Sequence, residues 1–153
     1  IGTTEGRIYY SEDKGATWEI QETPIISDEP TQGIYSIDFY DENVGFAIGG
    51  DYTEPSSSVK NKIKSTDGGK TWQLMADGQE PGYKSCVQFV PNSNGEALVA
   101  AGFTGISYSS DGGATWTQKS QWYGGFGFDY VHADQHSLHV PYCPTQHSAL
   151  ESL

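Results

Sequence analysis

The stretch Ser65-Thr66-Asp67-Gly68-Gly69-Lys70-Thr71-Trp72 decides the fold of this chain, because a box of the same form occurs three times. The other two boxes are Ser11-Glu12-Asp13-Lys14-Gly15-Ala16-Thr17-Trp18 and Ser109-Ser110-Asp111-Gly112-Gly113-Ala114-Thr115-Trp116. Their first serines stand at 11, 65 and 109, so successive boxes are 54 and 44 residues apart. Self-similarity at such a period is typical of stacked supersecondary units.

Each box has the residues of a tight β-hairpin. The Asp carboxylate and the Ser hydroxyl can accept hydrogen bonds from backbone N–H groups in the turn, and the following Gly adopts a positive φ without strain. Strand-like segments flank each box, such as 62–64 and 71–74 around the second one. Three of the four tryptophans occupy the last position of a box, which favours a packing role over ligand binding.

Two more pairs of strand-like segments lie between the boxes, at 34–40 with 44–49 and at 85–90 with 97–102. Four short strands per repeat predict an all-β fold, a β-propeller of four-stranded antiparallel blades with about three blades present. We expect the end of one blade at 1–24, blades at 25–78 and 79–120, and the irregular start of a further blade at 121–153. Closed propellers have about four to eight blades, so the rest of the ring should come from the parent polypeptide or from another copy.

Composition excludes several classes of partner. The chain of 153 residues has 20 acidic against 8 Lys and Arg residues and a net charge of −12. Nucleic acid needs clustered basic residues, so it is not an expected partner. No stretch reaches the roughly 18 apolar residues of a membrane span, so we expect no membrane insertion, and no pattern calls for a cofactor. Cys86 and Cys143 fit either two buried thiols or one disulfide formed in an oxidising compartment.

Over roughly residues 1–120, the three boxes resemble the Asp-box, or BNR, repeats of sialidases, the sortilin ectodomain, xyloglucanases and photosystem-assembly propellers. The resemblance implies a propeller fold, with the boxes at blade edges and remote from any ligand site. Sialidases hold the substrate carboxylate with an arginine cluster, and the photosystem-assembly proteins are associated with an arginine-rich patch. Arg7 is the single arginine of this chain, so neither of these two functions is carried over.

A second constellation lies near the carboxyl end, where His132, Asp134, His136 and His139 fall within eight positions. Residues two apart on a strand share a face, so His132, Asp134 and His136 could together hold a transition metal or supply a general acid. The same residues also fit a ligand-contacting site or a polar loop satisfied by its neighbours. Trp122 and Tyr123 suit stacking on sugar rings, and they suit a blade core equally well.

Paired carboxylates are the remaining source of chemistry, because most glycosidases need two acids flanking the scissile bond. Asp38, Asp129 and Asp134 are the candidates for acid and base. Asp38 alternates with apolar residues, so we expect it to point away from the packed face as an axial or solvated acid. The sequence as a whole favours a non-catalytic, extracytoplasmic module that binds or assembles with protein or carbohydrate. The alternative is part of a glycoside hydrolase propeller.

Overall fold

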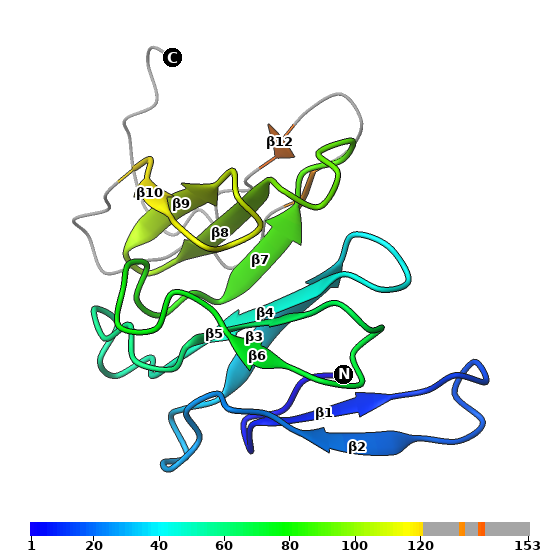
Figure 1. The fold of residues 1–153 in the computed structure, drawn as a ribbon. Coiled ribbons are helices and arrows are strands. Elements are labelled where there is room, and N and C mark those ends of the chain that lie inside the picture. Colours follow the sequence, from blue (N-terminus) through cyan, green and yellow to red (C-terminus); the bar gives the residue numbers. More distant parts are fainter. Residues whose placement is uncertain (121–131, 134–137, 140–153) are drawn as a thin grey trace.

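The computed structural model describes residues 1–120, 132–133 and 138–139. In those residues every regular secondary-structure element is a β-strand, and the strands form small sheets stacked on one another (Figure 1). The strands are β1 (Arg7–Tyr10), β2 (Glu19–Glu22), β3 (Ile34–Phe39), β4 (Gly45–Gly49), β5 (Lys62–Ser65), β6 (Gln73–Leu74), β7 (Cys86–Phe89), β8 (Leu98–Gly102), β9 (Gly105–Ser109), β10 (Thr117–Gln118), β11 (His132–Ala133) and β12 (Leu138–His139). Within the described part of the chain, no helix could cross a membrane.

Two of the sheets are four-stranded and follow the chain order without crossovers, β3-β4-β5-β6 and β7-β8-β9-β10. Every pair in them is antiparallel, so each sheet is a meander of hairpins. This confirms the predicted all-β fold of four-stranded blades. We call these sheets blade 2 and blade 3, and we call the pair β1-β2 blade 1.

Blade 1 contains more than its two named strands. The amino group of Ile1 donates to Tyr9 O over 2.7 Å, and Tyr9 N donates back to Ile1 O over 2.8 Å. Thr3 N donates to Arg7 O over 3.0 Å, and Gly2 forms a bridge with Ile8. Residues 1–3 therefore run antiparallel to β1, along the edge that faces away from β2.

All three boxes lie at one edge of the stack, which we call the box edge. They form the β1–β2, β5–β6 and β9–β10 turns, at the same ends of the sheets as the β3–β4 and β7–β8 turns. Gly68 N donates to Asn43 O over 2.9 Å, and Gly112 N donates to Glu96 O over 2.7 Å. The loops 50–61 and 75–85 connect strands at the opposite edge, the loop edge.

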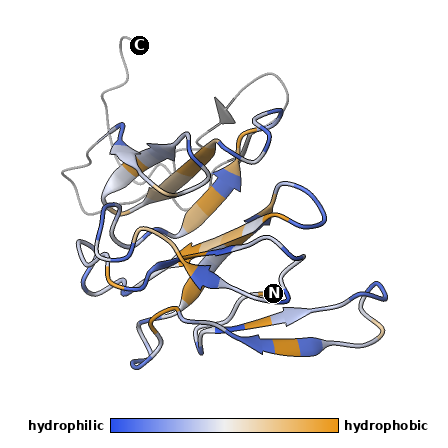
Figure 2. Cartoon of the chain, viewed as in Figure 1, coloured by the Kyte–Doolittle hydropathy of each residue, from blue (hydrophilic) through white to orange (hydrophobic). Residues whose placement is uncertain are grey.

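The apolar core lies between the sheets rather than within any one of them. Ile8 of blade 1 packs with Ile34, Ile63 and Trp72 of blade 2. A second cluster joins blades 2 and 3 and contains Phe46, Ile48, Val87, Phe89, Leu98 and Ala100. Every residue of β4 and of β8 is buried, and Figure 2 shows hydrophobic residues concentrated on β4, β7 and β8, whereas β2 is mostly hydrophilic.

Candidate functional site

The boxes are closed by their own hydrogen bonds. In the second box the Asp67 carboxylate accepts from Thr71 N over 2.9 Å, from Thr71 Oγ1 over 2.6 Å and from Ser65 Oγ over 2.8 Å. Ser65 Oγ accepts from Gly69 N over 2.9 Å, and Trp72 Nε1 donates to Gly69 O over 3.0 Å. The first and third boxes repeat this pattern, with Asp13 and Asp111 as the acceptors.

These bonds hold the box carboxylates ionised. The hydroxyl and N–H of Thr71 lower the pKa of Asp67 to about 2, and the N–H and hydroxyl of Thr17 lower that of Asp13 to about 2. A carboxylate that accepts several hydrogen bonds in its charged form is a poor proton donor near neutral pH. The boxes therefore close turns and offer no general acid.

Asp38 lies on the opposite face of β3 from Ile37, as strand alternation predicts, and this face turns toward blade 3. It is half-buried, and its Oδ2 accepts the N–H of Phe89 in blade 3 over 2.8 Å. Burial raises the pKa of Asp38, and the Phe89 N–H acts in the opposite direction. Neighbouring Ser36 Oγ accepts from Val87 N over 3.0 Å, so β3 side chains bond the free edge of β7. The expectation of a solvated acid is corrected, because Asp38 is half-buried and links two blades, and its place relative to the propeller axis stays a prediction.

Most of the other predicted site residues lie outside the described residues. Asp129, Asp134, His136, Trp122 and Tyr123 are among those outside, as is Cys143, so the glycosidase pair, the metal site and the disulfide stay predictions.

The histidine segment is described only at its two short strands. The backbones of His132 and His139 are paired partners in β11 and β12. Among the described residues, no group of three His, Cys, Asp or Glu side chains could hold a metal ion.

A group of aromatic side chains lies at the loop edge, and we call it the aromatic cluster. It consists of Tyr35, Tyr52, Tyr83 and Phe103. The ring centroid of Tyr83 lies 5.1 Å from that of Tyr35, 5.3 Å from that of Phe103 and 6.5 Å from that of Tyr52. Such separations are typical of favourable aromatic pairs. Tyr83 is buried, whereas Tyr52 is 42% and Phe103 39% exposed, so the cluster presents rings from two blades to solvent.

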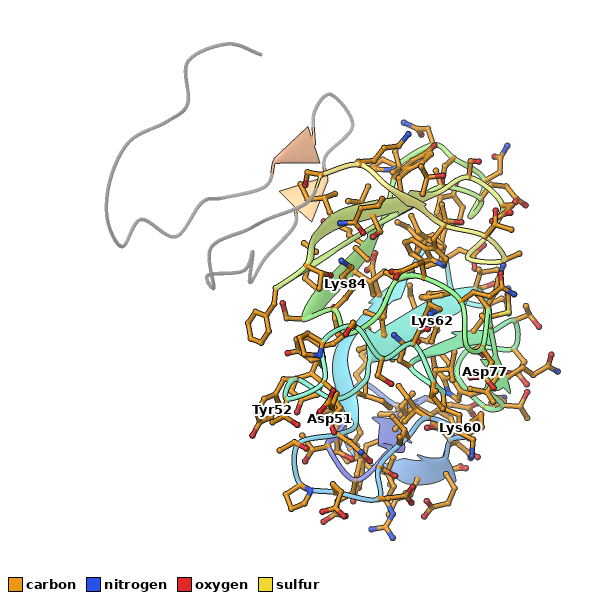
Figure 3. The ribbon with its side chains drawn as sticks, turned by 90° about the vertical axis from the view of Figure 1, so that its left-hand side faces the viewer. Asp51, Tyr52, Lys60, Lys62, Asp77 and Lys84 are labelled. Atoms are coloured by element: carbon orange, nitrogen blue, oxygen red, sulfur yellow. The ribbon has the colours of Figure 1, made fainter. Side chains whose placement is uncertain are left out.

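Two buried lysines fix the loops beneath this cluster. The Lys62 ammonium donates to Asn61 Oδ1, Gln79 O and Pro81 O over 2.7–2.9 Å. The Lys84 ammonium donates to Thr104 Oγ1 and Gly105 O over 2.8 and 2.9 Å, and both side chains lie inside the molecule in Figure 3. Burial lowers the pKa of each lysine to about 8. Because these bonds tie loops to strands, the base of the aromatic cluster is held firmly.

The rim of the cluster carries an ionised acid. Asp51 accepts from the hydroxyl of Thr53 over 2.6 Å and from Gln32 Nε2 over 3.1 Å. The Thr53 hydroxyl is the main cause that lowers the pKa of Asp51 to about 2. Figure 3 shows Asp51 and Tyr52 next to each other at this rim.

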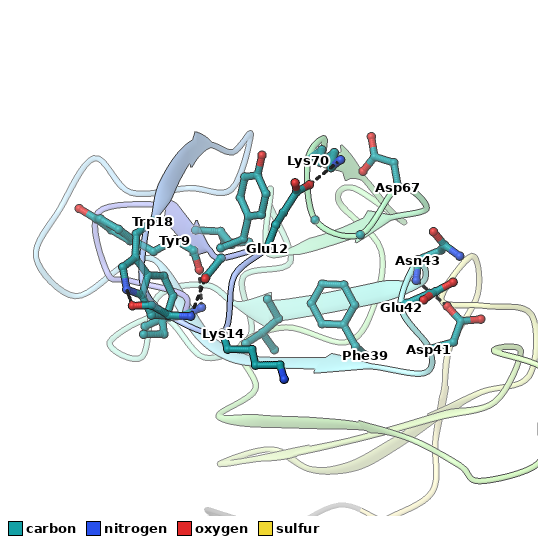
Figure 4. A pocket seen from close by; sticks show the side chains of 18 residues that line it. Tyr9, Glu12, Lys14, Trp18, Phe39, Asp41, Glu42, Asn43, Asp67 and Lys70 are labelled. Carbon is teal, nitrogen blue, oxygen red and sulfur yellow. Dashed lines mark hydrogen bonds and ion pairs between the residues drawn. The ribbon is translucent and has the colours of Figure 1, made fainter.

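A groove of about 910 Å³ lies at the box edge, between blades 1 and 2 (Figure 4). Tyr9 and Trp18 line it from blade 1, and Phe39 lines it from the end of β3. An ion pair of 2.6 Å between Lys70 and Glu12 joins the two boxes beside it. Trp18 is 48% exposed here and Phe39 is 39% exposed.

Sequence reasoning found neither the groove nor the aromatic cluster. The groove is formed by boxes that lie 54 residues apart, and the cluster by aromatic residues spread from 35 to 103. Tyr83 and Phe103, each directly after a glycine, and Tyr52 two residues after Gly50 were a visible signal for the cluster, since aromatic residues in loops suggest a contact surface.

Comparisons with known proteins agree with this architecture. The sequence model of the BNR/Asp-box repeat matches residues 63–74, which span the second box. No significant match was found among curated proteins. A solved structure described as YCF48 bound to D1 peptide aligns with a TM-score of 0.52 and 24% identity. The alignment covers 73% of this chain and 33% of that one, so this chain spans about a third of that protein. The chain therefore contains a BNR/Asp-box repeat at residues 63–74 and has the blade architecture of a β-propeller fold.

Proposed function

We propose that this chain is a non-catalytic propeller module that binds a segment of another protein at its loop edge, through the aromatic cluster. The observation that carries the proposal is the pair of exposed rings, Tyr52 from blade 2 and Phe103 from blade 3, on a buried Tyr83. Binding residues are concentrated on loops that a rigid scaffold positions, and aromatic residues are enriched in the centres of protein interfaces.

Charge indicates what kind of segment would bind. Asp51 at the rim is ionised at neutral pH, and the chain as a whole carries a net charge of −12. A partner segment with apolar side chains for the rings and basic residues for the rim would match this surface, since complementary charge raises association rates and disfavours wrong partners. An acidic segment would be repelled.

The solved propeller YCF48 is described as bound to a peptide, which supports a protein partner for a chain of this fold. Carbohydrate is the second ligand class, because exposed Tyr and Phe rings also stack on sugar faces. A location outside the cytoplasm belongs to the proposal as well, and it rests on the resemblance to the sortilin ectodomain alone.

A peptide-display selection against the purified chain tests the proposal, with an oligosaccharide array screened in parallel. Tyr52→Ala and Phe103→Ser should each weaken the selected peptides by tenfold or more, because they remove the exposed contact area. Ile20→Ser is the matched control, since Ile20 is exposed on β2 of blade 1, away from the loop edge. Selected peptides that bind both variants as well as the parent, or binding of oligosaccharides only, would contradict the proposal.

A further inference from the structure

The three tyrosine rings of the aromatic cluster stand nearly perpendicular to one another. The ring plane of Tyr35 is at 88° to that of Tyr52 and at 79° to that of Tyr83, and the planes of Tyr52 and Tyr83 are at 73°. Tyr83 is buried and contacts all three other rings of the cluster. The cluster therefore offers notches between upright rings, on a base that is already filled.

The backbone beside these rings is already paired. Tyr52 N donates to Thr31 O over 3.3 Å. Tyr83 N donates to Pro55 O over 3.0 Å. An incoming β-strand needs an exposed sheet edge with free backbone groups, and an incoming amphipathic helix needs a hydrophobic groove. The groove of about 910 Å³ lies at the box edge instead, so the cluster offers a partner mainly side-chain contacts.

A polyproline II segment suits such a surface. It is extended, has no internal hydrogen bonds, and binds to aromatic surfaces through its side chains without strand pairing. It has three residues per turn and rises about 3.1 Å per residue, so residues three apart lie on the same side at about 9 Å. The centroids of Tyr52 and Phe103 lie 6.5 Å and 5.3 Å from that of Tyr83, so one turn can reach from one exposed ring to the other.

The hydroxyl of Tyr52 supplies a donor for the backbone of such a segment. The Tyr35 hydroxyl donates to Thr31 O over 3.0 Å, whereas the Tyr52 hydroxyl has no hydrogen-bond partner in the described part of the chain. Tyr52 is also 42% exposed. The carbonyl groups of a polyproline II segment are not bonded to one another, so one of them can accept from this hydroxyl.

The loops of blade 2 beside the cluster are acidic. The segments 25–33 and 50–61 contain four acids and one lysine, namely Asp28, Glu29, Asp51, Glu54 and Lys60. Figure 3 shows Lys60 well apart from Tyr52. The field of Asp51 reaches the rings, because burial, Tyr52 and Asp51 together raise the pKa of Tyr35. A basic side chain is attracted to this rim and can also lie over a tyrosine ring.

We propose, on the basis of the function proposed above, that the segment bound at the aromatic cluster is proline-rich and adopts the polyproline II conformation. Two apolar side chains three residues apart lie on the rings of Tyr52 and Phe103, and a basic residue lies beside Asp51. The segment is already extended before it binds, so it loses less conformational freedom than a flexible segment does.

Three labelled peptides of equal length test the proposal, with binding to the purified chain followed by fluorescence anisotropy. The first is Pro-Pro-Leu-Pro-Pro-Leu-Pro-Arg, whose leucines are three residues apart. The second, Pro-Leu-Pro-Pro-Pro-Leu-Pro-Arg, has the same composition with its leucines four apart. The third has alanine in place of every proline of the first. The first should bind at least about fivefold more tightly than either of the others, because it alone combines the conformation with the register.

Variants of the chain and of the peptide locate the contacts. Tyr52→Ala and Phe103→Ser should each weaken the first peptide tenfold or more, and Ile20→Ser should leave its affinity unchanged. A form of the first peptide with glutamate in place of arginine should bind more weakly than the parent peptide, and added salt should reduce that difference.

The outcomes separate this proposal from the one on which it rests. If peptides selected by display bind through Tyr52 and Phe103 but the first peptide binds no better than its alanine form, the binding function stands and the polyproline II segment is overturned. Equal affinities of the first and second peptides would also overturn it, because the register on the rings would then not matter. If the first peptide binds Tyr52→Ala and Phe103→Ser as tightly as the parent chain, the aromatic cluster is not the site and both proposals fail.

Discussion

The two interfaces between blades are built from the same repeat, yet one is sealed and the other is open. Between blades 2 and 3, Phe46 fills the space beside the third box and is fully buried. Between blades 1 and 2, a groove of about 910 Å³ leaves Phe39 39% exposed. The boxes themselves hardly differ, because each closes with the same internal hydrogen bonds. The difference shows that a box builds a hairpin by itself, whereas the strands of the adjacent blade decide how far the space beside the box is filled.

The largest effect should come from emptying the sealed interface. Phe46→Ala removes a buried ring from between β4 and the third box, and such substitutions cost about 3–5 kcal/mol through lost burial and the cavity left behind. Phe39→Ala, at the open interface, should cost about 1 kcal/mol, because its ring is already partly in water. Urea unfolding of both variants measures the difference, and equal losses would show that the two interfaces are alike.

Two box tryptophans should differ in their effect on stability, because one is buried and the other is exposed. Trp72 is 7% exposed and packs with Ile8, Ile34 and Ile63, so Trp72→Ala should lower the free energy of unfolding by about 3 kcal/mol. Trp18 stands at the same place in the first box but is 48% exposed, so Trp18→Ala should cost under about 1 kcal/mol. Chemical denaturation followed by circular dichroism checks both. A large loss in Trp18→Ala would mean that the first box is packed in solution.

A third, smaller effect concerns the link between β3 and β7. Asp38→Ala leaves the half-buried N–H of Phe89 without its acceptor, which should cost about 1–3 kcal/mol. Asp38→Asn keeps an oxygen at that place and removes a half-buried charge, so it should cost less. Near-equal losses in the two variants would mean that the negative charge itself matters, as a catalytic or ion-pairing role would require.

The pH dependence of the Asp38 variants has a definite sign. Burial raises the pKa of Asp38 in the folded chain, so the folded state binds its proton more tightly than the unfolded state does. The contribution of Asp38 to stability therefore falls as the pH rises from 3.8, its ordinary pKa, through the raised value. Asp38→Asn should lack this fall, which unfolding measured at a series of pH values would detect.

The smallest effect should be the same in the first box, whose tryptophan is exposed, and in the second box, whose tryptophan is buried. Asp13 and Asp67 have pKa values lowered to about 2, so their contribution to stability is present above pH 3.8 and is lost as the pH falls toward 2. Asp13→Asn and Asp67→Asn should each flatten the acid limb of the stability profile to a similar degree. Acid titration followed by tryptophan fluorescence measures this, and a change at Asp67 only would show that packing, not the turn, sets the shift.

Whether the sequence predicted a feature of the fold depends on how far apart in the chain the contacting residues lie. The box hairpins and the four-stranded blades were predicted correctly, because their hydrogen bonds join residues close in the chain, such as Asp67 and Thr71. The hydrogen bond of Asp38 to blade 3 was not predicted, because its partner Phe89 lies 51 residues away on another blade. The aromatic cluster and the groove were missed for the same reason, since no local pattern records which loops or boxes become neighbours.

The sequence alone determined that each Ser-x-Asp-x-Gly-x-Thr-Trp box is a closed turn, because its donors and acceptors lie within four residues of one another. Only the tertiary structure decided what each turn contributes. Trp72 became part of a core and Trp18 stayed exposed, although their boxes share the same chemistry. The physical reason is that hydrogen bonds within a turn are local, whereas burial of a side chain depends on the neighbouring blade.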